Sequence, residues 1–171
     1  KYLESFGKYV VQQARTNLTK GKKNVTNELY NSIKFTVTPN SEGYNVSFSM
    51  DSYGEFVDKG VSGNKKIQEF TTFDGRKIES PFKYRSKQPP ANILSKWISM
   101  RGIKGRDKKS GRYITNLSLA FLIGKKIKRD GIKSLSFFQR PLGLGLKRLP
   151  NDIMIAIKED ILNNLKTITA K

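Results

Sequence analysis

The chain has 171 residues, contains no cysteine and no histidine, and carries a net charge of +19 from 33 lysines and arginines against 14 acidic residues. This composition excludes disulfides, thiolate nucleophiles, zinc sites of the usual kind and histidine-based acid–base catalysis. The length suits one domain, and a hydrophobic content of 36% predicts a modest core with long polar excursions. The positive charge predicts attraction to nucleic acid, to an anionic membrane or to an acidic protein surface.

The sequence indicates neither a membrane span nor a secretion signal. No apolar run approaches the roughly 18–20 residues needed to cross a bilayer, and polar residues interrupt any signal-like segment near residue 1. We therefore expect a soluble protein that is used without secretion and does not contact a membrane.

The first forty-odd residues predict two helices and then a β-hairpin. Residues 2–18 form an amphipathic helix by period, with Gly21 ending it, and Thr26 is expected to cap a short second helix carrying Leu29 and Ile33. Apolar and polar residues then alternate on both sides of a turn at residues 39–43, which predicts an antiparallel hairpin with one buried face. The apolar positions of the hairpin are Phe35, Val37, Tyr44, Val46, Phe48 and Met50.

The segment Tyr53–Gly60 predicts a single helical turn. Tyr53, Phe56 and Val57 are spaced i, i+3 and i+4, so they share a face that we expect to pack inward, and Gly60 can close the turn. Three carboxylates alternate with them at roughly one-turn spacing: Asp51, Glu55 and Asp58. They can be drawn as a magnesium nuclease site. We instead interpret them as the solvent-exposed face of the helix, with side chains too far apart to share an ion. We expect no catalysis, no metal and no cofactor.

Residues 61–88 are polar and contain one strong turn signal, Asp74-Gly75 between alternating runs, which predicts a hairpin that projects as an arm. Pro89-Pro90 then starts a helix in which Trp97 is expected to be a core anchor. A Gly- and Lys-rich loop at residues 102–116 follows, and residues 117–129 predict a helix ended by Gly131. Its expected apolar face consists of Leu117, Ala120, Phe121, Gly124 and Ile127.

The positive charge is concentrated in the second half of the chain. Between Arg101 and Lys133 there are eleven basic residues against Asp107 and Asp130. The candidate polyanion contact is made of Arg101, Lys104, Arg106, Lys108, Lys109 and Arg112. Such runs are often only solvated loops, but the glycines make this one pliable and the charge is one-sided, which favours a contact with phosphates or acidic protein. Interleaved aromatic rings are nearly absent, which argues against single-strand readout.

The end of the chain predicts an extended segment and a last helix. Phe137-Phe138 leads into an Arg140-Pro141 stop, and Pro150 is expected near the start of an amphipathic helix. The apolar stripe of that helix would be Ile153, Ile157, Ile161 and Leu165.

Two of these segments, in this order, resemble the tail-completion (neck, or head–tail joining) proteins of tailed bacteriophages. Residues 53–60 match a "Y-x-x-F-V-(D/E)-x-G" turn and residues 137–141 match an "FF-x-(R/K)-P" element, and the similarity reaches from about Thr26 to the C-terminus. The Trp97 helix and the "L-x-F-L-I" helix after it resemble an insert of larger family members. The residues carrying the motifs are Tyr53, Phe56, Val57, Gly60, Trp97, Phe138 and Pro141.

The elements predict an α+β fold, in which helices cover a small, mainly antiparallel sheet in a single domain of residues 1–171 with insertions at about 61–88 and 102–116. The resemblance implies a non-enzymatic virion protein, assembled in the host cytoplasm. Copies would form a ring in the neck between the portal and the tail, around the DNA channel. Two alternatives remain: a small basic protein that binds DNA without sequence preference, and a metal-dependent nuclease.

Overall fold

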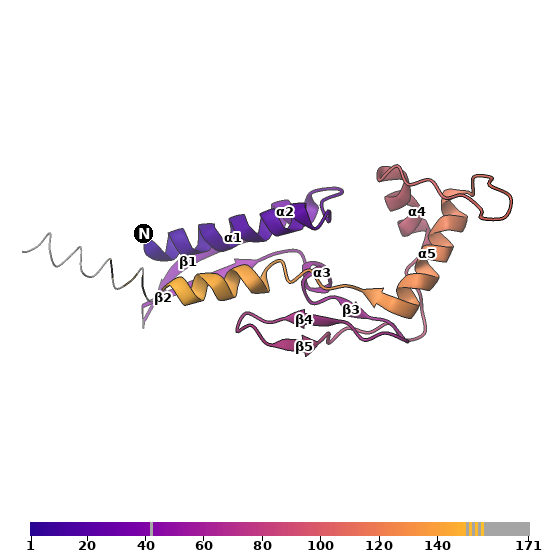
Figure 1. Cartoon of the computed structure of the whole chain (residues 1–171). Coiled ribbons are helices and arrows are strands. Elements are labelled where there is room, and N and C mark those ends of the chain that lie inside the picture. The colour runs from indigo at the N-terminus through magenta and orange to yellow at the C-terminus, as the bar shows by residue number, and fades with distance from the viewer. Residues whose placement is uncertain (42, 150, 152, 154, 156–171) are drawn as a thin grey trace, which may run out of the picture.

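The computed structural model describes residues 1–41, 43–149, 151, 153 and 155. It has the expected α+β composition, with an elongated body and a pair of helices standing at one end of it (Figure 1). Its elements, in chain order, are α1 (Tyr2–Lys20), α2 (Glu28–Ser32), β1 (Lys34–Asn40), β2 (Gly43–Ser49), α3 (Gly54–Lys59), β3 (Val61–Ser62), β4 (Glu69–Thr71), β5 (Lys77–Glu79), α4 (Ala91–Met100), α5 (Asn116–Asp130) and β6 (Gly131–Ile132). Residues 139–149 form a sixth helix.

The main core lies between α1, the β1–β2 hairpin and residues 135–142. The predicted stripe of α1 is confirmed, because Val10, Ala14 and Leu18 are fully buried and Gly21 follows the last turn. The antiparallel hairpin is confirmed as well, with strands that pair as far as Asn40 with Gly43. Its expected apolar face is only half-buried, and Tyr44 is exposed. The ring of Phe48 is central to the packing. The partners of that ring are Phe6, Phe35 and Phe138, with centroids 6.1, 6.4 and 5.4 Å away.

The second helix begins differently from the prediction. Asn27, in the left-handed region with φ of 58°, precedes α2 and makes no side-chain cap, so Thr26 is not the capping residue. Ile33 lies just after the helix and is fully buried. Arg15 of α1 donates to the carbonyls of Tyr30 and Ile33, each at 3.0 Å, which fixes the end of α2 against α1.

The helix at residues 139–149 was not predicted. Pro141, expected to stop the chain segment, instead lies buried in the first turn of this helix, where a missing N–H costs little. Two glycines allow close packing: a Cβ at Gly143 would overlap the carbonyl of Phe73, and one at Gly145 would lie 2.7 Å from the ring of Phe6. Ile153 is also helical, whereas Pro150, Ile157, Ile161 and Leu165 of the predicted last helix lie outside the described residues.

The β-structure of the described residues consists of three separate two-stranded antiparallel pairs rather than one sheet. The predicted hairpin at residues 69–79 is confirmed, but it is not a projecting arm. Phe70 is buried, the N–H of Thr71 donates to Ser136 Oγ, and the N–H of Phe73 donates to Gln139 Oε1, both at 3.0 Å. The hairpin therefore packs along the body, as Figure 1 shows.

The helical head (residues 89–130) leaves the body and returns to it at one place. β3 lies between the two connections: Ser62 exchanges backbone hydrogen bonds with Phe82 and Tyr84, in the segment that leads to the head, and pairs with Gly131 of β6, where the chain returns. Within the head, α4 packs on α5, with Ile98 and Ala120 fully buried. Trp97 is only half-buried, so Ile98 rather than Trp97 has the core position.

Candidate interaction surfaces

The two motif segments meet at the side chain of Asp58. This residue is only 3% exposed, and its Oδ1 accepts the N–H of Phe138 at 2.8 Å and that of Gln139 at 3.5 Å. Its backbone carbonyl accepts the N–H of Ser136 at 2.9 Å and the hydroxyl of Ser134 at 2.7 Å. Asp58 was expected on the wet face of α3, and that expectation was wrong: it caps the helix at residues 139–149 from a distant part of the chain.

The environment of this carboxyl group acts on its charge in two directions. Burial raises the pKa of Asp58, whereas the hydrogen bonds from Phe138 and Gln139 and the charge of Lys59 lower it, and the effect of burial is the larger. The pKa is therefore above its ordinary value. Protonation leaves a carbonyl oxygen that can still accept the Phe138 N–H, so both protonation states can cap the helix.

The aromatic residues of the first motif lie at the surface. Tyr53 is 41% and Phe56 is 43% exposed, so they do not pack inward, and only Val57 contributes to the main core, from a half-buried position. The ring of Phe56 meets that of Phe82 with centroids 4.4 Å apart, and both line an open groove with Tyr53 and Tyr84. Gly60 closes α3 as predicted, with φ of 72°.

The three carboxylates that suggested a nuclease do not converge. Asp58 is buried against Phe138, and Glu55 pairs with Lys59 at 2.9 Å on the exposed side of α3. Among the residues that the structure describes, no three acidic side chains are placed so that they could hold a metal ion. Asp51, Glu55 and Asp58 therefore do not form the magnesium site that their spacing suggested.

The basic loop contains a turn with several hydrogen bonds of its own. Asp107 Oδ1 accepts the N–H groups of Lys109 and Ser110 at 3.0 and 2.8 Å, and the N–H of Asp107 donates to the carbonyl of Arg112. Arg106 lies 4.4 Å from the centroid of the Tyr113 ring and donates to its hydroxyl. These contacts define the backbone of the turn and place Arg106 against Tyr113.

Five of the six predicted contact residues are exposed: Lys104, Arg106, Lys108, Lys109 and Arg112. The sixth, Arg101, is half-buried and donates to the carbonyl of Lys22, in the loop after α1, so it holds the head against the body.

The two acidic residues of the head, Asp107 and Asp130, offset only a small part of this charge. The hydrogen bonds from Ser110 hold the pKa of Asp107 below its usual value, and the guanidinium of Arg129, at 2.8 Å, does the same for the pKa of Asp130. Both carboxylates are therefore ionised and engaged with groups of their own chain. The remaining surface charge of the head is positive.

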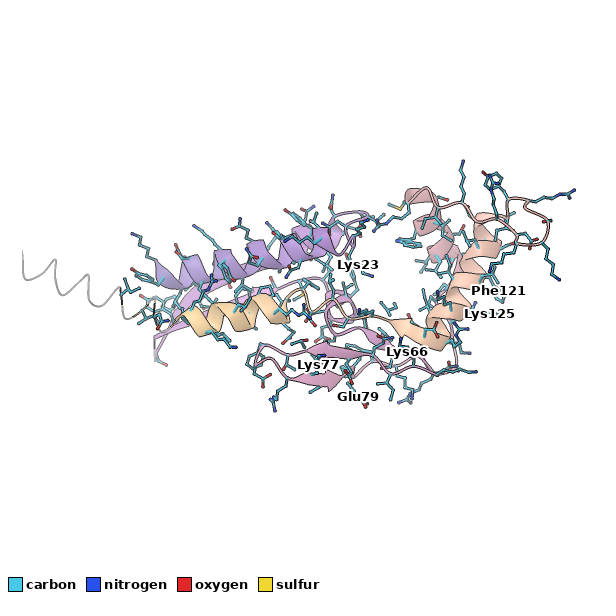
Figure 2. The ribbon with its side chains drawn as sticks, viewed as in Figure 1. Lys23, Lys66, Lys77, Glu79, Phe121 and Lys125 are labelled. Carbon is cyan, nitrogen blue, oxygen red and sulfur yellow. The ribbon has the colours of Figure 1, made fainter. Side chains whose placement is uncertain are left out.

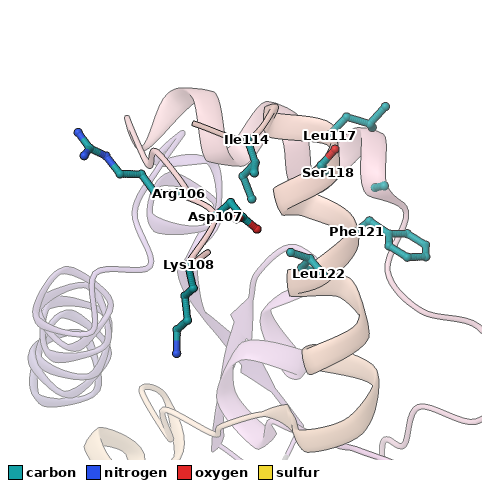
Figure 3. Close-up of a pocket in the computed structure, with 9 residues that line it drawn as sticks. Arg106, Asp107, Lys108, Ile114, Leu117, Ser118, Phe121 and Leu122 are labelled. Atoms are coloured by element: carbon teal, nitrogen blue, oxygen red, sulfur yellow. The ribbon is translucent and has the colours of Figure 1, made fainter. Parts of the chain in front are cut away.

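An apolar groove that the sequence did not indicate lies between this loop and α5. Arg106, Asp107 and Lys108 line it from the loop, together with Ile114 and with Leu122 of α5. The carboxylate of Asp107 points toward α5, whereas the side chains of Arg106 and Lys108 extend away from the helix, at the edge of the groove (Figure 3). Leu117, Phe121 and Leu122 are 58, 46 and 55% exposed. The predicted apolar face of α5 is thus only partly buried: Ala120 and Gly124 are buried. The sequence did contain a sign of this groove: α5 has more apolar residues than α4 alone can cover.

Within the described part of the chain, no helix is both long and apolar enough to cross a membrane. Comparison with known proteins gives no matching family model, no matching curated protein and no matching solved structure.

Proposed function

We propose that this chain is a structural protein of the neck of a tailed bacteriophage, where copies form a ring that completes the junction between portal and tail. The observation that supports this most is the bond between Asp58 and Phe138. It joins the two segments on which the family resemblance rests. If the two short motifs matched by chance, no buried hydrogen bond between them would be expected. If they belong to one packing arrangement, such a contact is expected.

The surface of the molecule suits a subunit of an assembly. Exposed aromatic and aliphatic side chains gather at two places, the groove at Tyr53, Phe56 and Phe82 and the groove on the helical head. Uncovered apolar patches of this kind commonly mark protein–protein contacts. The groove on the body is available to a neighbouring copy in a ring, and the groove on the head lies apart from it and is available to a different partner.

A reconstruction of the neck of the phage particle that carries this protein tests the proposal. We expect several copies in a closed ring between portal and tail, with Tyr53 and Phe56 covered by a neighbour. A particle with one copy, or with none at that junction, would contradict it. The mass of the purified chain in solution is a useful companion measurement, because it shows whether the ring forms before it reaches the particle.

A second candidate is a small basic protein that binds duplex DNA through phosphates alone, and the five exposed cations of the loop favour it. Binding would then be blind to sequence, with log K falling by about 0.9 for each phosphate neutralised per unit of log salt. An association constant that differs among duplexes of unrelated sequence, or that is insensitive to salt, would exclude this candidate.

A further inference from the structure

We infer that the groove between the basic loop and α5 is a docking site for an acidic protein segment with apolar side chains along one face. This inference stands whether or not the chain forms a ring, because it depends only on the surface of the helical head. Neither the apolar lining nor the positive rim alone would define the partner. Their combination in one groove does.

The apolar side of the groove is formed by side chains that the described part of the chain leaves largely uncovered. Leu117 and Phe121 are one turn apart on α5, and Leu122 lies beside them with Ile114 of the loop. More than half of Leu117 and Leu122 is exposed to solvent. Covering such side chains releases about 25 cal/mol for each Å² of apolar surface, so a partner with complementary apolar groups gains affinity here.

The rim of the groove is positive. Arg106 and Lys108 line it from the loop, and Lys125 lies over the ring of Phe121, with Nζ 4.8 Å from the ring centroid (Figure 2). Asp107, the acidic member of the lining, already accepts hydrogen bonds from Ser110 and Lys109. Asp107 keeps its negative charge and offsets one of the three nearby positive charges, so the surroundings of the groove remain net positive, which favours association with carboxylates on a partner.

These properties distinguish between the possible occupants. Duplex DNA presents phosphates to a protein and would leave Leu117 and Leu122 facing polar backbone without apolar contact. A second copy of a chain with net charge +19 would bring further positive charge to a positive rim. An acidic amphipathic segment, such as a helix laid into the groove, satisfies both the apolar lining and the rim.

Fluorescence anisotropy on the full chain can test this with designed probes. The main probe is a labelled peptide of about 16 residues with Leu at i, i+3, i+4 and i+7 and Glu at most other positions. A second peptide has the same composition in scrambled order, and a third probe is a duplex of about 20 base pairs. We expect the amphipathic peptide to bind at least about tenfold tighter than the scrambled one, because only its apolar groups face the groove together.

Two substitutions should weaken this binding by different routes. Leu122→Ser removes apolar contact and should lower the affinity for the amphipathic peptide by about fivefold or more. Lys108→Glu should lower the same affinity by a factor that becomes smaller at high salt. The matched control is Leu144→Ser, which removes an equally exposed leucine (52%) from the helix at residues 139–149, and should leave binding unchanged. All three residues are exposed, and unchanged thermal unfolding of the variants would establish that they fold.

Three results would overturn the inference. Equal affinities for the amphipathic and scrambled peptides would mean that only electrostatic attraction contributes to binding. Tighter binding of the duplex, unaffected by Leu122→Ser, would assign the surface to DNA. Loss of self-association in Leu122→Ser, measured by sedimentation, together with no peptide binding, would assign the groove to a second copy of the chain.

Discussion

The carboxylate of Asp58 and the backbone N–H of Phe138 form a buried hydrogen bond of 2.8 Å between residues eighty positions apart. Phe138 immediately precedes the helix at residues 139–149, whose first N–H groups have no partner within the helix. A short surface helix, α3, thus supplies the cap for a helix that belongs to the main core. The same contact brings Phe138 against the ring of Phe48, so the hydrogen bond and the aromatic packing support each other.

Asp58→Ala should lower the free energy of unfolding by about 2–4 kcal/mol, because it leaves buried N–H groups without an acceptor. Asp58→Asn keeps an acceptor oxygen and should cost less. Urea denaturation provides the measurement, with the midpoint as readout. The control is Glu55→Ala on the exposed side of α3, which removes only an i,i+4 pair with Lys59 and should cost at most about 0.5 kcal/mol. Equal effects of Asp58→Ala and Glu55→Ala would show that the cap contributes nothing to stability.

The stability that depends on Asp58 should increase as the pH falls. Its pKa is raised in the folded state, mainly by burial, so the folded protein binds the proton more tightly than the unfolded chain. This contribution is therefore fully present below the unfolded pKa of about 3.9 and is lost as the pH rises through the folded value. We expect the stability of the wild type, measured relative to Asp58→Asn, to rise on acidification.

Asp130 gives a control of opposite sign for that experiment. The hydrogen bond from Arg129 lowers the pKa of Asp130, so its contribution is present above the unfolded pKa and is lost as the pH falls through the folded one. Relative to Asp130→Asn, the wild type should lose stability on acidification, by a small amount because the ion pair lies at the surface. The same direction of change for both variants would mean that burial does not determine the titration of Asp58.

Periodicity predicted the elements whose partners are close in sequence. The stripe of α1, the β1–β2 alternation and the Asp74-Gly75 turn all appear where expected, because helix and strand periods and turn residues act locally. Gly131 ends α5 for the same reason.

The failures have a common cause in long-range contacts. A single turn such as α3 has too few residues for its period to define a buried face, and the need of Phe138 for an acceptor, eighty residues away, turns Asp58 inward. The helix at residues 139–149 was missed because Pro141, Gly143 and Gly145 lower its propensity. Close packing against Phe73 and Phe6 compensates for this, and no local pattern reveals that packing. The head groove was missed since α5 looked like an ordinary core helix.

Gly143→Ala should destabilise the protein by about 1–3 kcal/mol, because its Cβ would overlap the carbonyl of Phe73 in the β4–β5 hairpin. The matched control is Gly124→Ala in α5, where the nearest atoms, of Gln88 and Pro89, are 3.4 Å from the new Cβ. There the higher helix propensity of alanine should stabilise by about 0.5–1 kcal/mol. Thermal unfolding of both variants should therefore shift in opposite directions. A stabilised Gly143→Ala would mean that the hairpin does not pack on this helix.

Replacing the five exposed cations of the loop with serine should change polyanion binding with a loss of stability of at most about 1 kcal/mol, from the contact between Arg106 and Tyr113. The five are Lys104, Arg106, Lys108, Lys109 and Arg112. They face solvent, and the Asp107 turn that orders the loop uses backbone and Ser110 donors that remain. If the loop binds phosphates, the slope of log K against log salt for duplex DNA should become shallower by about 0.9 for each phosphate that the variant no longer neutralises. Filter binding over a range of salt measures this slope.

Arg101→Ser separates the sixth basic residue from the other five. Its guanidinium donates to the Lys22 carbonyl and is half-buried, so its removal should loosen the head from the body. We expect the free energy of unfolding to fall by about 1 kcal/mol, while the salt slope for DNA stays that of the wild type. Hydrogen exchange at the N–H groups of residues 22–24 should also speed up. A changed salt slope with unchanged stability would instead place Arg101 among the residues that contact the polyanion.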